Sequence, residues 1–150
     1  MRGLLSGQVM VSTTITIDVS FNAITKLYDT SKEYGLTCGS YTAKVTAEAL
    51  RLDRVGRVIG SNAIKDSLEE WVSKAWNNSV ILNAEDAESI KAIRRLKKSS
   101  IYLLTCNPTA ENMANYLLRN VTPRVLKAVN VRVVKVIIYT PNGFYSESKI

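Results

Sequence analysis

The sequence predicts an α+β fold, in which an antiparallel sheet carries helices packed on one face. Residues 9–21 and 41–52 alternate between apolar and polar side chains, which is the period of strands with one buried face. After the second of these strands, two stretches carry apolar residues at helical spacing. A β-branched run follows them toward the C-terminus. The predicted order of elements is therefore ββααββ, within a single domain of 150 residues.

The alternation assigns the side chains of the first two strands to faces. The inward sets are Val9, Val11, Thr13, Ile15, Ile17, Val19 and Phe21 in the first strand, and Tyr41, Ala43, Val45 and Ala47 in the second. We expect the strands to pair antiparallel across a long loop at 22–39. Strands of this length present open edges, which favours oligomerisation through the sheet.

Helix signals occupy the middle of the chain. A helix is predicted over 62–76, with Ser61 or Asn62 as its cap, and a shorter one over 85–98. Residues 101–105 form a short strand-like run. Asn107 and Pro108 then predict a third helix, with asparagine as N-cap and proline in the first turn.

The C-terminal part of the chain reads as two strands joined by a turn. Residues 131–140 form a β-branched run that is too continuously apolar for a half-exposed strand. The turn sequence Pro-Asn-Gly at 141–143 separates this run from a closing edge strand at 144–149.

The composition excludes several kinds of chemistry, because the chain contains no histidine. It cannot build a Ser-His-Asp or Cys-His pair, nor a three-histidine metal site. Cys38 and Cys106 are predicted to be reduced thiols, since they form no CxxC pair. No apolar run has the length of a membrane span or a signal peptide, so we expect a cytoplasmic protein without membrane contact.

The formal net charge is +7, and it has one dense cluster. The cluster consists of Lys91, Arg94, Arg95, Lys97 and Lys98. No aromatic residue is interleaved with it to stack on bases, so we favour a solvated helix face. A basic module that binds nucleic acid or an acidic protein is the alternative.

Three stretches resemble the 6-pyruvoyl- and 6-carboxy-tetrahydropterin synthase family. They are FNAIT (21–25) with CGSYT (38–42), LDRVGRVI (52–59) with the later LN (82–83), and NPTAEN (107–112) with YT (139–140). The resemblance implies the tunnelling fold, with sheets joined into an oligomeric barrel as a trimer or hexamer. The stretch 85–98 then reads as a family-variable helical insertion.

The resemblance also gives the missing histidines their positions. The three zinc histidines of the family correspond to Thr25, Thr37 and Gly39, and its catalytic cysteine corresponds to Glu33. Threonine and glycine are not zinc ligands, because they offer only a weak hydroxyl oxygen or nothing. We therefore expect no zinc and no other cofactor.

Two further functional positions of the family are changed. Its Asp-His pair becomes Asn78 and Ser79, which hold no group that titrates near neutral pH. Its pterin-binding glutamate becomes Tyr139, ahead of Thr140. A phenol cannot accept the two parallel hydrogen bonds that a carboxylate accepts from the guanidine-like edge of a pterin.

The remaining candidates for ligand binding lie in the third stretch. They are Thr109, Ala110 and Glu111, together with Tyr139 and Thr140. Glu111 is either a ligand contact or a first-turn acid of its helix. Three functions stay open: a non-catalytic homologue with a structural, regulatory or pterin- or purine-like ligand-binding role, a metal-free enzyme using Glu33 and Glu111 on a pterin or deazapurine-like substrate, and the basic interaction module.

Overall fold

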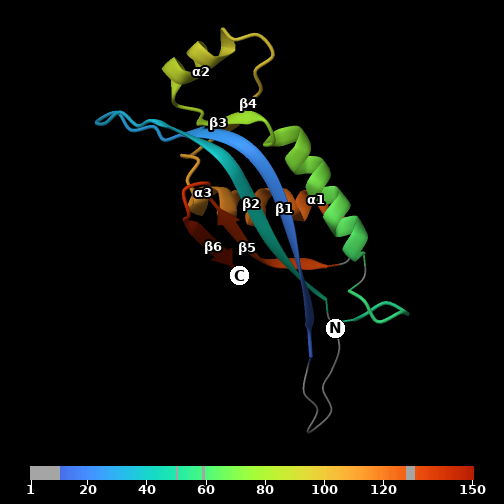
Figure 1. Cartoon of the computed structure of the whole chain (residues 1–150). Helices are drawn as coiled ribbons and strands as arrows, with labels where there is room; N and C mark the ends of the chain where they lie inside the picture. The colour runs from blue at the N-terminus through green and yellow to red at the C-terminus, as the bar shows by residue number, and fades with distance from the viewer. Residues whose placement is uncertain (1–10, 50, 59, 128–130) are drawn as a thin grey trace.

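One curled, six-stranded sheet runs through the computed structural model, which describes residues 11–49, 51–58, 60–127 and 131–150 (Figure 1). The strand order is β4-β3-β1-β2-β5-β6. The strands are β1 (Thr13–Lys26), β2 (Leu36–Ala49), β3 (Ser79–Asn83), β4 (Ile101–Leu104), β5 (Arg132–Tyr139) and β6 (Tyr145–Lys149). The helices are α1 (Ser61–Ala75), α2 (Ala87–Arg94), α3 (Ala110–Tyr116), the π-helix η1 (Leu117–Val121) and α4 (Thr122–Val125).

The first two strands form the predicted antiparallel hairpin, and they are longer than predicted. Their pairing runs from Thr13 with Ala49 to Lys26 with Leu36, so the connecting loop covers only 27–35. The alternation continues through Ala23 and Thr25, which are buried although the segment looks polar. The predicted loop at 22–39 was therefore too long. Residues 9, 10 and 50 of the two predictions lie outside the described residues.

The prediction of an antiparallel sheet was wrong for one side of the sheet. β3 pairs parallel with β1, and β4 pairs parallel with β3, whereas β2, β5 and β6 are antiparallel to their neighbours. All five residues of β3 are buried, so the strand has no alternation by which to be recognised. Because parallel neighbours need a crossover connection, the chain passes through α2 between β3 and β4, and through β2 and α1 between β1 and β3.

The prediction that helices pack on one face holds for α1 and α3 but not for α2. The main hydrophobic cluster joins α1, α3, η1 and one face of the sheet, and it includes Ile81 of β3. Val80 and Leu82 point to the other face, where they form a second cluster with Ile90 of α2. A strand that is buried on both faces needs cover on both, and α2 supplies the second layer (Figure 1).

Three predicted helix ends also differ from the structure. The residue that precedes α1 is Gly60, with a φ of 74°, and neither Ser61 nor Asn62 caps the helix. α3 is capped by Thr109, whose hydroxyl accepts a hydrogen bond from the Asn112 amide at 3.1 Å. Asn107 does not cap, because its side chain bonds both backbone groups of Tyr28. The helix predicted over 85–98 ends at Arg94.

Pro123 coincides with a change in helix type. The chain passes from α3 into η1 and then into α4, which has proline in its first turn. Proline has no amide hydrogen to donate, and its ring crowds the carbonyl one turn earlier. A widened π turn relieves that contact. The hydroxyl of Thr122 donates to the Leu118 carbonyl at 3.2 Å and so satisfies one carbonyl of the irregular segment.

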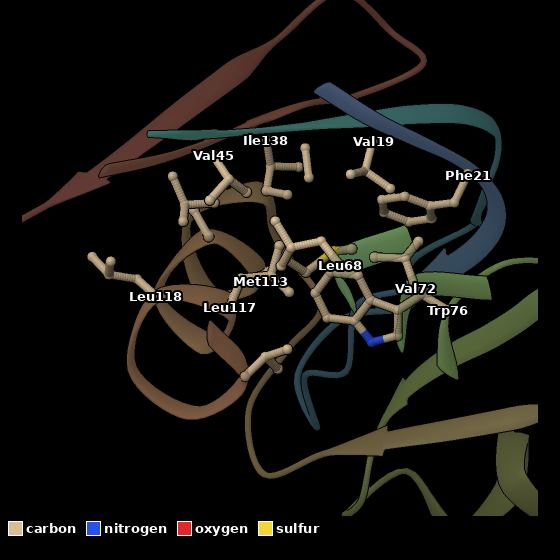
Figure 2. Close-up of a cluster of buried hydrophobic side chains, with 14 of the residues drawn as sticks. Val19, Phe21, Val45, Leu68, Val72, Trp76, Met113, Leu117, Leu118 and Ile138 are labelled. Carbon is tan, nitrogen blue, oxygen red and sulfur yellow. The ribbon is translucent and has the colours of Figure 1, made fainter. Parts of the chain in front are cut away.

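Aromatic residues fill the centre of the main cluster. Trp76 is completely buried, and its ring lies 5.4 Å from Phe21 and 5.2 Å from Trp71. Figure 2 shows its indole among Phe21, Leu68 and Val72, with Met113 nearby. Trp76 therefore belongs to the core, and Trp71 of α1 packs against it.

The long strands keep partly unpaired edges, as predicted. β1 pairs with β3 only from Ala23 to Lys26, so its segment 13–22 has a strand on one side only within the described part of the chain. Likewise, β2 pairs with β5 only from Thr42 onward. Such edges are available for pairing with another copy. Oligomerisation itself stays a prediction.

Replacing Asp86 with asparagine is expected to destabilise the protein by about 1–2 kcal/mol at pH 7. The Asp86 side chain is buried, caps α2 by accepting from the Ser89 amide, and pairs with Lys26 Nζ at 3.3 Å. Burial alone would raise the pKa of Asp86, but hydrogen bonds from Ser89 and Lys26 outweigh it and hold this pKa below its usual value. Asparagine can still cap the helix, so the loss reports the ion pair.

The lowered pKa of Asp86 in the folded protein determines the pH range in which its ion pair stabilises the fold. The stabilisation is fully present above the unfolded-state pKa of about 3.9 and is lost as pH falls through the lower folded-state pKa. Urea unfolding at pH 7 and below pH 4 should show the gap between wild type and Asp86→Asn closing in acid. The control Glu69→Gln removes an exposed pair with Lys65 and should cost below about 0.5 kcal/mol. An unchanged gap in acid would contradict the assignment.

Candidate functional site

Strand pairing brings the three former histidine positions together. Thr25 of β1 lies directly opposite Thr37 of β2, and Gly39 lies opposite Ala23. Positions two apart on a strand share a face, so Thr25, Thr37 and Gly39 occupy adjoining places on one face of the hairpin. The sequence resemblance identified these positions individually, and the register of β1 with β2 makes them a single constellation.

A pocket of about 600 Å³ opens over Thr25 and Thr37, whereas Gly39 is not among its described lining residues. It lies between the hairpin β1–β2, the start of α3 and the turn between β5 and β6. Of the predicted site residues, Thr25, Thr37, Thr109, Ala110, Glu111 and Thr140 line it. Sequence reasoning did not single out the other lining residues, which are Leu27, Tyr34, Gly35, Leu36, Tyr41, Pro108, Asn142, Phe144, Tyr145 and Ser146.

Most of the missed residues lie outside the quoted motifs, whereas Tyr41 and Pro108 belong to the motifs at 38–42 and 107–112. Asn142, Phe144 and Ser146 belong to the turn and edge strand that follow β5, and Tyr34 belongs to the loop before β2. The signal that could have found them is the pairing of β2 with β5, which places Thr42 opposite Tyr139 and so brings the following turn beside residues 37–41.

Thr25 forms part of a buried hydroxyl pair in the pocket. Only 4% of the residue is exposed, and its Oγ1 lies 2.9 Å from the Tyr41 phenol oxygen. The Tyr41 ring stacks on Phe21 at 5.3 Å, which fixes its position. Burial raises the pKa of Tyr41, and the Thr25 hydrogen bond opposes that rise only in part. The first former histidine position therefore presents a neutral hydroxyl that already has a partner.

Gly39 leaves no room for a side chain. Its φ is 151°, and a Cβ at this position would lie 2.7 Å from Pro141 Cβ and 3.1 Å from Pro141 Cγ. The proline begins the β5–β6 turn and packs where a side chain of residue 39 would begin. This position therefore has no space for an imidazole as long as Pro141 stays in place.

The start of α3 supplies the one acidic group of the pocket. Thr109 caps the helix, Ala110 is buried at its first turn, and Glu111 is exposed beside them. The cap explains Thr109 without any ligand, whereas the sequence predicted Asn107 as the capping residue. Glu111 makes no ion pair within the described part of the chain, so its carboxylate is available to the pocket.

Tyr139 and Thr140, at the end of β5, lie in different surroundings. Thr140 lines the pocket, and its hydroxyl bonds Asn142 and Phe144 to close the turn. Tyr139 is not among the lining residues. Its ring lies 5.2 Å from Tyr145 and 6.0 Å from the ammonium of Lys44. Tyr139, which was predicted as a ligand contact, therefore lies outside the described lining of the pocket.

The other three candidates lie apart from the pocket lining. Asn78 is exposed in the turn after α1, and Ser79 is buried, with its hydroxyl 3.0 Å from that of Ser100. Glu33 is exposed and lines a different cavity of about 370 Å³, beside the loop 28–34 and the start of α2. Glu33 and Glu111, the two candidate catalytic acids, therefore do not share a pocket.

The donor set does not fit the zinc ion that the resemblance implies. A zinc site needs imidazole, thiolate or carboxylate ligands, and the constellation offers two hydroxyls and a glycine. Within the described ranges, no three His, Cys, Asp or Glu side chains are grouped so as to hold a metal ion. Cys38 follows Thr37 but is exposed, and both Cys38 and Cys106 are free thiols, as predicted. Burial raises the pKa of Cys106.

The predicted surface features can also be placed. The five clustered cations lie on α2 and the turn that follows it, and all are exposed. Among the described residues, no helix is long and apolar enough to cross a membrane.

The curled sheet, its helical layer and the pocket at the hairpin define an α+β protein of the tunnelling-fold class. The sequence model of 6-pyruvoyl tetrahydropterin synthase matches residues 14–148. The chain therefore belongs to the 6-pyruvoyl tetrahydropterin synthase family.

Curated relatives agree with this assignment. The chain is 32% identical over 105 residues to a 6-carboxy-5,6,7,8-tetrahydropterin synthase of Rickettsia conorii, covering 69% of this chain and 76% of the relative. The homologue of Rickettsia felis gives the same identity and coverage.

Solved structures share the fold at lower identity. An uncharacterized protein from Wolinella succinogenes has a TM-score of 0.72 at 14% identity, covering 93% of this chain and 98% of the other. The 6-pyruvoyl tetrahydropterin synthase of Plasmodium falciparum has a TM-score of 0.63 at 14% identity, with coverages of 93% and 99%. These identities support the fold alone.

Proposed function

We propose that this family member has no zinc-dependent synthase activity and uses its retained pocket to bind a small heterocycle of the pterin or purine type. The observation that carries the proposal is the constellation of Thr25, Thr37 and Gly39. The sheet register assembles the positions correctly, but none of the three offers a metal ligand, and Pro141 closes the space at one of them.

The pocket chemistry supports a ligand that donates hydrogen bonds. Among the described residues, its lining contains one carboxylate, Glu111, several hydroxyl groups, and no lysine or arginine. A carboxylate accepts two parallel hydrogen bonds from a guanidine-like edge, which pterins and guanine share. Tyr34 and Phe144 add aromatic surface for a flat ring. An anionic ligand such as a phosphate finds no counter-charge here.

Zinc analysis tests the first half of the proposal. Protein purified without a tag and dialysed against excess zinc should retain far less than one ion per chain, because hydroxyl oxygens bind zinc weakly. A Rickettsia 6-carboxy-tetrahydropterin synthase treated in parallel serves as the comparison. One tightly held zinc per chain would contradict the proposal.

Ligand titration tests the second half. Biopterin and guanine are expected to quench tryptophan or pterin fluorescence on binding, and Glu111→Gln should weaken the binding by about 10- to 100-fold, the cost of losing hydrogen bonds to a charged acceptor. Glu33→Gln is the matched control, since that carboxylate lines another cavity, and it should leave the affinity unchanged. Equal effects of the two variants would argue against the pocket as the binding site.

The alternative function is a metal-free enzyme that acts on a pterin or deazapurine-like substrate. Glu111 is the only acid at the pocket that could move a proton, and Glu33 lies elsewhere. This function predicts product formation in the presence of a chelator, abolished by Glu111→Gln and retained in Glu33→Gln. Binding without turnover would leave the non-catalytic role.

We further propose that the protein works as a homo-oligomer in the cytoplasm, as a trimer or hexamer. The unpaired edge of β1 over 13–22 supports association between copies. The turn residues Phe144 and Tyr145 are exposed beside the pocket, which places apolar surface where another copy could contribute to it. Sedimentation equilibrium measures the number of chains.

A further inference from the structure

The helix α2 and the turn after it carry a concentrated positive surface, which we call the basic tip: Lys91, Arg94, Arg95, Lys97 and Lys98. All five side chains are exposed. None of them forms an ion pair within the described ranges, whereas Lys26, Lys44, Arg57 and other cations of the chain do. The tip stands beyond β3 and β4, away from β5 and β6 (Figure 1). The charges of the basic tip therefore take part in no ion pair within the described part of the chain.

The charges of this region are segregated. Glu85, Asp86 and Glu88 line the cavity shared with the loop 26–34, where Lys26 and Lys32 are nearby. The basic tip lies toward the C-terminal end of α2. Its own cavity shares Ala87 with the acidic one but has no acidic side chain among its described lining residues. Placing cations at the helix C-terminus is favourable by itself, but this accounts for the last turn and not for Lys97 and Lys98.

A further pocket, of about 490 Å³ and distinct from the two cavities described above, lies against the basic tip. Its lining combines aliphatic side chains with three of the five cations: Ala84, Ala87, Ile90, Lys91, Arg94 and Arg95. Ile90 belongs to the second hydrophobic cluster, so one wall of the pocket is anchored in packed structure. An aliphatic hollow rimmed by cations fits an apolar side chain whose neighbours are acidic.

We propose that the basic tip is a docking surface for an acidic segment of a partner protein, with one aliphatic side chain seated in the pocket against Ala87 and Ile90. Carboxylates of the segment pair with Arg94 and Arg95, whose planar guanidinium groups suit bidentate contacts. A nucleic-acid backbone would contact the cations but leave the aliphatic pocket empty. Residues 84–98 also contain no aromatic side chain on which a base could stack.

The test uses a dye-labelled peptide in which one leucine is flanked by pairs of glutamates, measured by fluorescence anisotropy. The full chain is expected to bind it, and the variant with Lys91→Gln, Arg94→Gln and Arg95→Gln should bind about tenfold or more weakly. The same peptide with serine in place of leucine should also bind more weakly. Binding should weaken as salt is raised.

Two further variants separate the site from net charge and from folding. Arg54→Gln, Arg119→Gln and Lys127→Gln neutralise three exposed cations away from the tip, which likewise form no ion pair within the described chain. This matched variant should keep the wild-type affinity. Ala87→Glu puts a carboxylate into the pocket at the first, exposed residue of α2, where an acid suits the helix, and it should abolish binding without loss of stability.

Four outcomes would overturn the proposal. They are absence of peptide binding at low salt, an equal loss in the matched charge variant, and tighter binding of a single- or double-stranded oligonucleotide than of the peptide. The fourth is a change of oligomer size in the tip variant without any peptide binding, which would assign the tip to contacts between copies.

Discussion

Gly39→Ala is expected to lower the free energy of unfolding by about 2–4 kcal/mol, although it adds only one methyl group. The added Cβ would lie 2.7 Å from Pro141 Cβ, which is well inside van der Waals contact. The φ of 151° is also a conformation that residues with a side chain rarely adopt. Steric overlap and backbone strain therefore act together, and urea unfolding followed by circular dichroism measures the sum.

Gly35→Ala is the matched control, because a Cβ there meets nothing within 4 Å. Its free energy of unfolding should stay within about 0.5 kcal/mol of wild type. In a double-mutant cycle, Pro141→Gly should recover part of the Gly39→Ala loss, with a coupling of about 1 kcal/mol or more. Equal stability of the two alanine variants would show that Pro141 does not pack against residue 39.

The contact between residue 39 and Pro141 also limits how a zinc site could be introduced at positions 25, 37 and 39. Histidine at positions 25 and 37 has only hydroxyl side chains to replace, but histidine at 39 must also displace Pro141. A chain with all three histidines is therefore expected to bind zinc only when Pro141 is replaced as well. The turn between β5 and β6 thus helps to determine what the hairpin can hold.

Trp76→Ala is expected to cost about 3–5 kcal/mol of stability, the largest effect of any single substitution considered. The side chain is completely buried, and four aromatic rings surround it, those of Phe21, Trp71, Tyr102 and Tyr116. Truncation is expected to open a cavity at the place of the indole, which Figure 2 shows among the core side chains. Chemical denaturation followed by far-ultraviolet circular dichroism gives the loss.

Trp76→Phe tests the contribution of the indole N–H to stability separately from that of an aromatic ring. Within the described chain, the indole Nε1 is a buried donor without a hydrogen-bond partner, so removing it recovers a desolvation cost and offsets part of the lost packing. This variant should lose clearly less than Trp76→Ala, and it leaves Trp71 as the single tryptophan. A loss as large as that of alanine would show that Nε1 has a partner.

The parts of the fold that sequence reasoning could predict are those with a clear period. The alternation of β1 and β2 and the helical stripe of α1 gave their elements and their buried faces. β3 was missed because a strand buried on both faces has no alternation, and with it the parallel pairing and the second layer were missed. The cap of α3 was misplaced because Asn107 bonds Tyr28, a contact 79 residues away in sequence.

The site was predictable to a similar degree. The motif of residues 107–112 and the former histidine positions located Thr25, Thr37 and Glu111, and the register brought them to one pocket. The turn residues Asn142 and Phe144 could not be found, because their place depends on how β5 pairs with β2. Glu33 was placed with the site because the resemblance aligns it with the catalytic cysteine of the family, but the loop before β2 carries it to another cavity.

The sheet lies between the two hydrophobic clusters, so each of its faces packs against a different set of side chains. A substitution in α2 changes the packing of Val80, Leu82 and Ile90, whereas the pocket residues around Thr25 lie on the other face. Substitutions at the pocket and substitutions in α2 are therefore expected to affect the packing of different clusters, one on each face of the sheet.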